Sequence, residues 1–179
     1  MWIFPNNNYN NFYNWPKNRI FDTEMKGNEF LHQVWYEFFR EEDLQRLLKI
    51  RAALKRFNLY PDGRSDEDVT ALQAAHLLRA FALRLNPAGK DFNTQVMKGM
   101  NSPVVESLSK ILGEGDGWLY PNEDGVVMYL LISTEGERMI IRRDGQNDKF
   151  IGTTDEQPVE RFVVFNSEAL KRIATILNE

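Results

Sequence analysis

The chain has 179 residues, of which 42% are hydrophobic, and this is enough apolar material for one domain with a real core. It contains no cysteine, which excludes disulfides, a thiolate nucleophile and a cysteine-based zinc site, and which agrees with a reducing, cytoplasmic location. The sequence shows neither an apolar run long enough to span a membrane nor a secretory signal. We therefore expect a single cytoplasmic domain over residues 1–179.

The formal net charge of −4 is unevenly distributed along the chain. Residues 1–57 carry a net charge of +2 and residues 58–112 are neutral, whereas residues 113–179 hold seven basic and 13 acidic side chains, a net charge of −6. An acidic surface repels nucleic-acid phosphates and suits a basic protein partner, although a mildly negative charge is also ordinary in soluble proteins.

The first fifteen residues combine six asparagines with six aromatic residues, a composition that is poor in helix formers. Because so many rings are too much apolar surface to leave in water, we expect an irregular arm that packs on the domain. The alternatives are an aromatic stacking platform for bases or sugars, and a swapped arm that joins two copies of the chain in a homo-oligomer.

Apolar residues at helical spacing predict about four helices before residue 113. One stripe begins at Phe30 and Leu31, and a second helix follows the acidic residues 41–43. The residues expected on the buried side of this second helix are Leu44, Leu47, Leu48, Leu54 and Phe57. The helix also carries a run of cations: Arg46, Lys49, Arg51, Lys55 and Arg56. These side chains could bind phosphates, but we interpret them as a solvent-exposed face of the helix.

Ser65 and Asp68 have the spacing of a capping box and predict the start of a third helix. Residues 69–85 are apolar on nearly all sides, which is typical of a central helix. The polar positions of this helix recur at three-residue steps and predict a buried hydrogen-bonded strip of Gln73, His76 and Arg79.

The segment 90–101 gives no clear pattern, but Ser102 and Pro103 are typical of the cap and first position of a short helix. Gly113 is expected to stop that helix. The glycine-rich residues 113–117 then mark a subdomain junction, with residues 1–112 mainly helical and residues 118–179 forming an antiparallel sheet and one helix.

Three strands are predicted after the junction. The β-branched and apolar residues 126–132 and 139–141 form a hairpin, and residues 161–165 form a third strand. A final helix, capped by Asn166 or Ser167, should cover the sheet with one apolar face made of Leu170, Ile173, Ala174 and Leu177. The predicted fold class is therefore α+β, with about four helices, a small antiparallel sheet of three or more strands and a C-terminal helix.

Metal-site patterns are weak. The two histidines, His32 and His76, belong to different predicted helices and have no ligand spacing. One segment approaches the spacing of a calcium-binding loop, with Asp144, Gln146, Asp148, Ile151 and Asp155. Because Lys149 stands where the turn needs glycine, we interpret this segment as an acidic loop and expect neither a metal nor another cofactor.

An enzyme is the main alternative to a binding protein. Asp116, Asp124 and Glu137 could converge around the hairpin to form a metal-dependent phosphodiesterase or nuclease site. Two points weigh against this site. Arg138 follows Glu137 at the position where such a site needs a lysine, and surface hairpins commonly carry acids. Nucleic-acid binding through the cations of residues 46–56 is a weaker alternative.

No residue constellation in the chain has a catalytic signature, so the leading interpretation is a non-catalytic binding protein. An immunity-type or inhibitor protein would neutralise one basic protein partner through its acidic C-terminal third. The predicted contact residues are acids and aromatics of that third: Glu114, Asp116, Trp118, Tyr120, Glu123, Asp124, Asp144 and Asp148.

Overall fold

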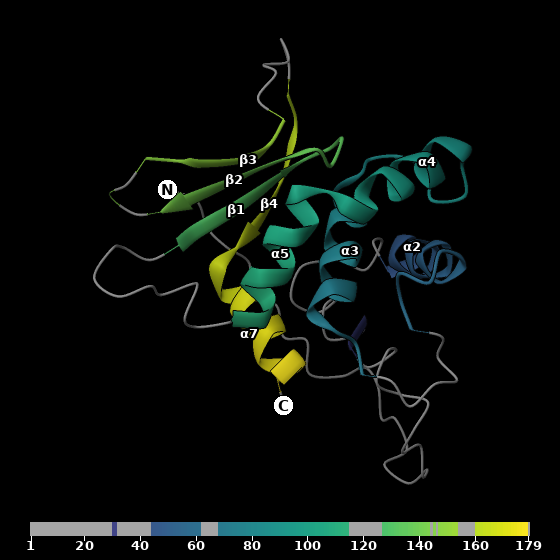
Figure 1. The fold of residues 1–179 in the computed structure, drawn as a ribbon, viewed down its shortest axis with the longest axis horizontal. Helices are drawn as coiled ribbons and strands as arrows, with labels where there is room; N and C mark the ends of the chain where they lie inside the picture. Colours follow the sequence, from purple (N-terminus) through teal and green to yellow (C-terminus); the bar gives the residue numbers. More distant parts are fainter. Residues whose placement is uncertain are drawn as a thin grey trace, which may run out of the picture.

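The computed structural model describes residues 30–31, 44–61, 68–114, 127–143, 145, 147–153 and 160–178. Within these ranges a helical part is followed by an antiparallel sheet and then by a C-terminal helix, so the predicted α+β class is confirmed. In Figure 1 the helices lie to the right of the sheet and below it. The aromatic N-terminal arm lies outside the described residues.

The helical part contains four described α-helices and one 3-10 turn. They are α2 (Leu44–Arg56), α3 (Ala71–Ala82), α4 (Lys90–Lys98), η2 (Gly99–Asn101) and α5 (Pro103–Glu114). Helix α3 packs on α5 and on α2, and it lies between them in Figure 1. Its residues 74–82 are all buried, which confirms the predicted central helix. The pattern-free segment after residue 89 forms α4 and η2.

The buried side of α2 differs in part from the prediction. Leu47 and Leu54 are fully buried as expected, but Leu48 is 37% exposed. Ile50 and Ala53 are buried instead. The reason is the helical period: Leu47, Ile50 and Leu54 lie on one face at steps of three and four, while Leu48 is turned about 100° away from Leu47.

Two helix boundaries were predicted wrongly: the start of the third helix, expected at Ser65 and Asp68, and the end of α5, expected at Gly113. Helix α3 begins at Ala71, and its capping box is formed by Thr70 and Gln73: the Gln73 N–H donates to Thr70 Oγ1 (3.2 Å), and the Thr70 N–H donates to Gln73 Oε1 (2.9 Å). Helix α5 is capped as expected, since the Val104 N–H donates to Ser102 Oγ (3.2 Å). It continues through Gly113 to Glu114, because a glycine in helical conformation costs only about 1 kcal/mol relative to alanine.

The sheet contains four antiparallel strands in the order β3-β2-β1-β4. They are β1 (Val127–Ser133), β2 (Arg138–Arg143), β3 (Lys149–Gly152) and β4 (Phe162–Asn166). The predicted hairpin and the predicted third strand are confirmed as β1, β2 and β4. The interpretation of residues 144–155 as an acidic loop is wrong in part, because residues 149–152 form strand β3 and pair with β2.

Helix α7 (Ser167–Asn178) follows β4 without an intervening residue. The Ala169 N–H donates to Asn166 Oδ1 at 2.8 Å, so Asn166 is the predicted cap. Leu170, Ile173 and Ala174 are buried as predicted, and α7 packs on α5 and contacts β1 and β4. The buried residues of helices and strands form one continuous hydrophobic core. Within the described part of the chain, none of the helices combines the length and apolar character that crossing a membrane requires.

Candidate interaction surface on the sheet

The helices cover one face of the sheet. Helix α5 contacts β3, α3 contacts β1, and α7 contacts both β1 and β4. Residues that pair across the strands share a face, and those of the covered face are buried: Leu130, Ile132, Met139, Ile141 and Phe165. We call the opposite side the outer face.

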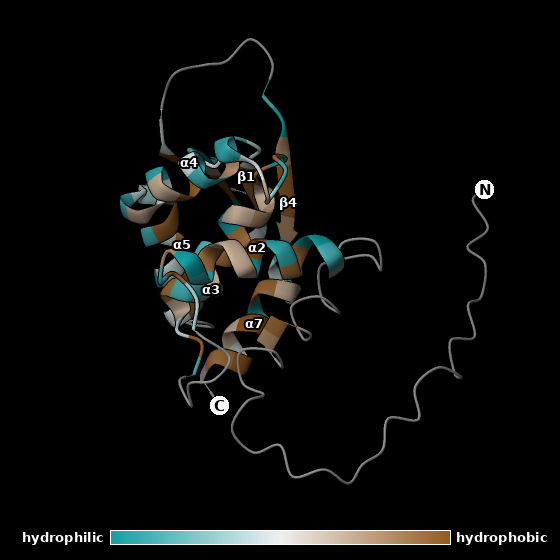
Figure 2. Cartoon of the chain, turned by 90° about the vertical axis from the view of Figure 1, so that its right-hand side faces the viewer, coloured by the Kyte–Doolittle hydropathy of each residue, from teal (hydrophilic) through white to brown (hydrophobic). Residues whose placement is uncertain are grey.

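An apolar row crosses the outer face through all four strands. The register places Val164 opposite Leu131, Leu131 opposite Ile140, and Ile140 opposite Phe150. Phe150 and Val164, at the two ends of the row, are each 54% exposed, and the neighbouring Tyr129 is 41% exposed. Figure 2 shows β4 along the flank of the molecule away from α5, apolar over most of its length. Between these exposed ends Leu131 is half-buried and Ile140 is only 8% exposed. Exposed apolar side chains on a sheet face are typical of interaction sites.

Ion pairs flank the apolar row. Arg142 makes two hydrogen bonds to the Asp148 carboxylate, at 2.7 and 3.0 Å, and this contact lowers the pKa of Asp148 and raises the pKa of Arg142. Arg138 donates to Glu160 Oε2 at 2.9 Å, and its guanidinium lies 4.9 Å from the centroid of the Phe150 ring. The charges beside the row are thus already neutralised in pairs, which gives an apolar centre with a polar rim.

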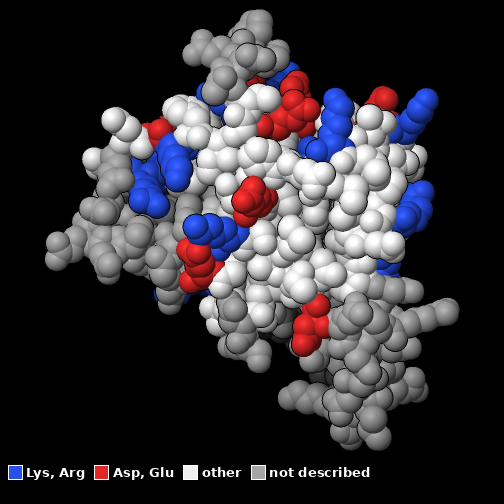
Figure 3. All heavy atoms as spheres, in the orientation of Figure 1, with Lys and Arg blue, Asp and Glu red and all other residues white. Residues whose placement is uncertain are grey.

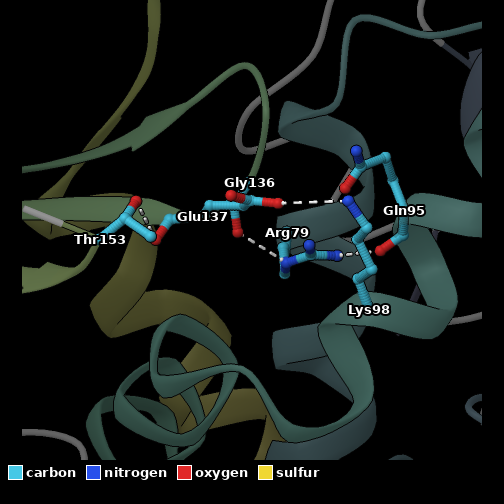
Figure 4. Close-up of polar contacts among 6 residues, drawn as sticks. All are labelled: Arg79, Gln95, Lys98, Gly136, Glu137 and Thr153. Carbon is cyan, nitrogen blue, oxygen red and sulfur yellow. Dashed lines mark hydrogen bonds and ion pairs between the residues drawn. The ribbon is translucent and has the colours of Figure 1, made fainter. Parts of the chain in front are cut away.

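The hairpin that carries this face is held to the helices by a buried arginine. Arg79, on α3, is only 3% exposed. Its Nε donates to the Gly136 carbonyl (2.8 Å), and its guanidinium donates to the Gln95 carbonyl near the end of α4 (3.0 Å). Burial lowers the pKa of Arg79, while the nearby charge of Glu137 opposes this shift. Figure 4 shows Arg79 between the hairpin and α4.

Two glycines make room for this arginine. A Cβ atom on Gly99 would run into the Arg79 guanidinium, and a Cβ atom on Gly136 would lie 2.8 Å from Leu83 Cδ2. Gly136 also has a φ of +72°, which side chains disfavour. Of the three residues in the predicted buried hydrogen-bonded strip, Arg79 has that role, whereas Gln73 is only half-buried and serves the helix cap.

His76, on α3, is buried near the charge of Arg79. Burial first and the Arg79 charge second lower the pKa of His76 to about 4, so the imidazole is neutral at neutral pH. Among the described residues no three histidine or carboxylate side chains gather where they could hold a metal ion. His32 lies outside the described residues.

Two of the predicted contact residues are described, and each has a cationic neighbour. Glu114, at the end of α5, lies 3.8 Å from Lys110, and Asp148 precedes β3 and binds Arg142. Their joint role in one contact surface stays a prediction. On the face drawn in Figure 3, acidic and basic side chains of the described residues are interspersed. The remaining predicted contact residues lie outside the described ranges: Asp116, Trp118, Tyr120, Glu123, Asp124 and Asp144.

The structure describes parts of the two alternative sites, the carboxylates around the hairpin and the cations of α2. Glu137 contacts Lys98 (3.9 Å), while Asp116 and Asp124 lie outside the described residues, so their convergence stays a prediction. On α2, Arg46 donates to the Leu85 carbonyl (3.0 Å) and also to the Leu83 carbonyl. At least this member of the cationic run serves an internal contact at the end of α3.

The sequence interpretation missed the outer face because its residues become neighbours only through strand register. Phe150 belongs to a strand of four residues, and Val164 belongs to a uniformly apolar segment in which no alternation marks one face. Comparisons of the chain with protein-family models, with curated proteins and with solved structures found no match in any of the three.

Proposed function

We propose that the chain is a non-catalytic protein-binding module of the cytoplasm whose contact surface is the outer face of the sheet. The apolar row from Val164 to Phe150 carries this proposal, because its ends are more than half exposed. The exposed Phe150 ring and the exposed Val164 side chain each gain free energy when a partner removes them from water.

The partner that best suits this module is one basic protein, the kind of partner that an immunity-type or inhibitor protein would bind. Two observations support this choice. Residues 113–179 carry a net charge of −6, and the outer face has carboxylates at its rim, in Asp148 and Glu160. Basic side chains of a partner could compete with Arg142 and Arg138 for these carboxylates, which would make binding weaken as salt rises.

The test is a pull-down from cytoplasm of the native cell with the tagged full-length chain, at low and high salt, followed by mass spectrometry. It compares the wild type with Phe150→Glu, which places a charge in the apolar row. Leu72→Glu is the matched control, because Leu72 is similarly exposed (48%) but lies on α3. Far-UV circular dichroism checks that both variants fold.

The expected result is one stoichiometric basic protein that the wild type and Leu72→Glu retain and that Phe150→Glu loses. Equal retention by both variants would remove the outer face from the proposal. An empty pull-down with the wild type would count against a binding module altogether. The enzyme alternative would then be tested by its own signature, a thermal midpoint that rises with divalent metal.

A further inference from the structure

Strand β4 forms one edge of the sheet, and the direction of its hydrogen bonds follows from the register. The pair Ser133 and Phe162 is followed by Thr134 opposite Arg161, and the Thr134 N–H donates to the Arg161 carbonyl at 2.8 Å. In an antiparallel ladder the residues of one strand alternate between facing the neighbour and facing away. The backbone groups of Phe162 and Val164 therefore point away from β1, towards the open edge.

The β4 edge lacks the features that usually protect an edge strand. Its five residues contain no proline and no lysine, and its register with β1 runs without a bulge. In the part of the chain that the structure describes, the outward N–H and carbonyl groups of Phe162 and Val164 have no hydrogen-bond partner. This strand is a template for a further strand.

The opposite edge is protected. Strand β3 has only four residues, begins with Lys149 and ends at Gly152, whose φ is +97°. The next residue still pairs with β2, since the Thr153 N–H donates to the Glu137 carbonyl (3.1 Å) in register with the pairs before it. Short length and an edge lysine are devices that discourage strand addition. The two edges of the described sheet differ, because β4 contains neither a lysine nor a glycine of positive φ.

We propose that β4 pairs antiparallel with β4 of a second copy of this chain about a two-fold axis. Phe162 of one copy then lies opposite Val164 of the other, and the reverse pair forms by symmetry. Each pair exchanges its N–H and carbonyl groups, so the outward groups of both residues are satisfied in both copies. A contact that is complementary to itself in this way is what a closed two-fold dimer requires.

The charges beside β4 are compatible with this pairing. Arg161 would lie opposite Phe165 of the second copy, and Glu160 opposite Asn166, so the register opposes no like charges. Glu160 is already neutralised by Arg138. On the outer face, Phe162 of each copy covers Val164 of the other, which is 54% exposed in the single chain. The two apolar rows then meet at these pairs, offset from each other by two residues, because Phe162 lies opposite Ser133 in its own sheet.

This inference goes beyond the proposed function, because the dimer holds whether or not the outer face binds another protein. Its test is the mass of the untagged full-length chain by sedimentation over about a hundredfold range of concentration. The wild type should reach twice the monomer mass. Val164→Pro removes an N–H that makes no bond within its own sheet, and Val164→Lys charges the edge. Each should weaken dimerisation at least about tenfold.

Leu72→Lys is the control, and it should dimerise like the wild type because Leu72 is equally apolar and similarly exposed at a distant helix. Hydrogen exchange gives a second measurement: the amides of Phe162 and Val164 should exchange rapidly in dilute solution and become protected as the dimer forms. A wild type that stays monomeric throughout the range would overturn the proposal. So would a dimer that neither Val164 variant weakens, or one that leaves these two amides unprotected.

Discussion

Arg79 shows how a single polar residue can fix the relation between two layers. A buried guanidinium is costly unless its donors are used, and here they reach two backbone carbonyls from different elements, those of Gln95 and Gly136. Both contacts are to backbone oxygens, so neither depends on the rotamer of an acceptor side chain. Gly99 is required by this arginine, whereas Gly136 is required also by Leu83 and by its own positive φ.

We expect Arg79→Met to destabilise the fold by about 2–4 kcal/mol, because methionine fills part of the space but removes the Arg79 donor from the Gly136 carbonyl and from the Gln95 carbonyl, which keeps the Gly99 N–H. The free energy of unfolding from urea denaturation measures this effect. Arg84→Met is the control: Arg84 is exposed five residues later, and its replacement should change stability by no more than about 0.5 kcal/mol. Equal effects of the two replacements would contradict the role given to Arg79.

His76 makes the stability depend on pH. Its pKa is about 4 in the fold and about 6.5 in the unfolded chain, so between these values the unfolded state binds more protons. The neutral imidazole's contribution is complete above about pH 6.5 and is lost as the pH falls towards 4. Between pH 7 and pH 5, the wild type should lose about 2 kcal/mol more unfolding free energy than His76→Leu. Parallel losses in urea denaturation would show that His76 titrates normally.

At the scale of elements, local patterns predicted which segments are helices and strands better than where they end. Ser65 and Asp68 have the right spacing for a capping box, but so do Thr70 and Gln73, and only packing of the apolar turns decides between them. Gly113 was expected to end helix α5, yet a glycine ends a helix only where its backbone adopts the left-handed conformation. Strand β3 was missed because four mostly exposed residues carry little periodic signal.

At the scale of the whole molecule, the candidate surface was the least predictable part. The sequence indicated a binding protein and acids after the helical part, but the apolar row depends on pairing between strands that are distant in sequence. No window of residues contains Val164 and Phe150 as neighbours of Leu131 and Ile140. The Arg79 contacts join positions 57 and 16 residues apart, which is equally invisible to local patterns.

The single domain expected for residues 1–179 remains a prediction, and the continuous core provides its test. Because helices and strands share one hydrophobic cluster, we expect a single cooperative unfolding transition without separate melting of the sheet part. Calorimetry should give a ratio of calorimetric to van't Hoff enthalpy near one. A ratio well above one, or two resolved transitions, would instead support independent subdomains on either side of residues 113–117.

The position of β1 between β2 and β4 has a consequence for synthesis in the cell. Strand β1 pairs with β2 through a short turn as soon as both have left the ribosome, but its other edge has no partner until β4 arrives. During that interval an interior strand with Leu130 and Ile132 behaves as an exposed apolar edge. Chains that stop before residue 162 keep this edge permanently, so incomplete products of this protein should be prone to aggregation and to proteolysis.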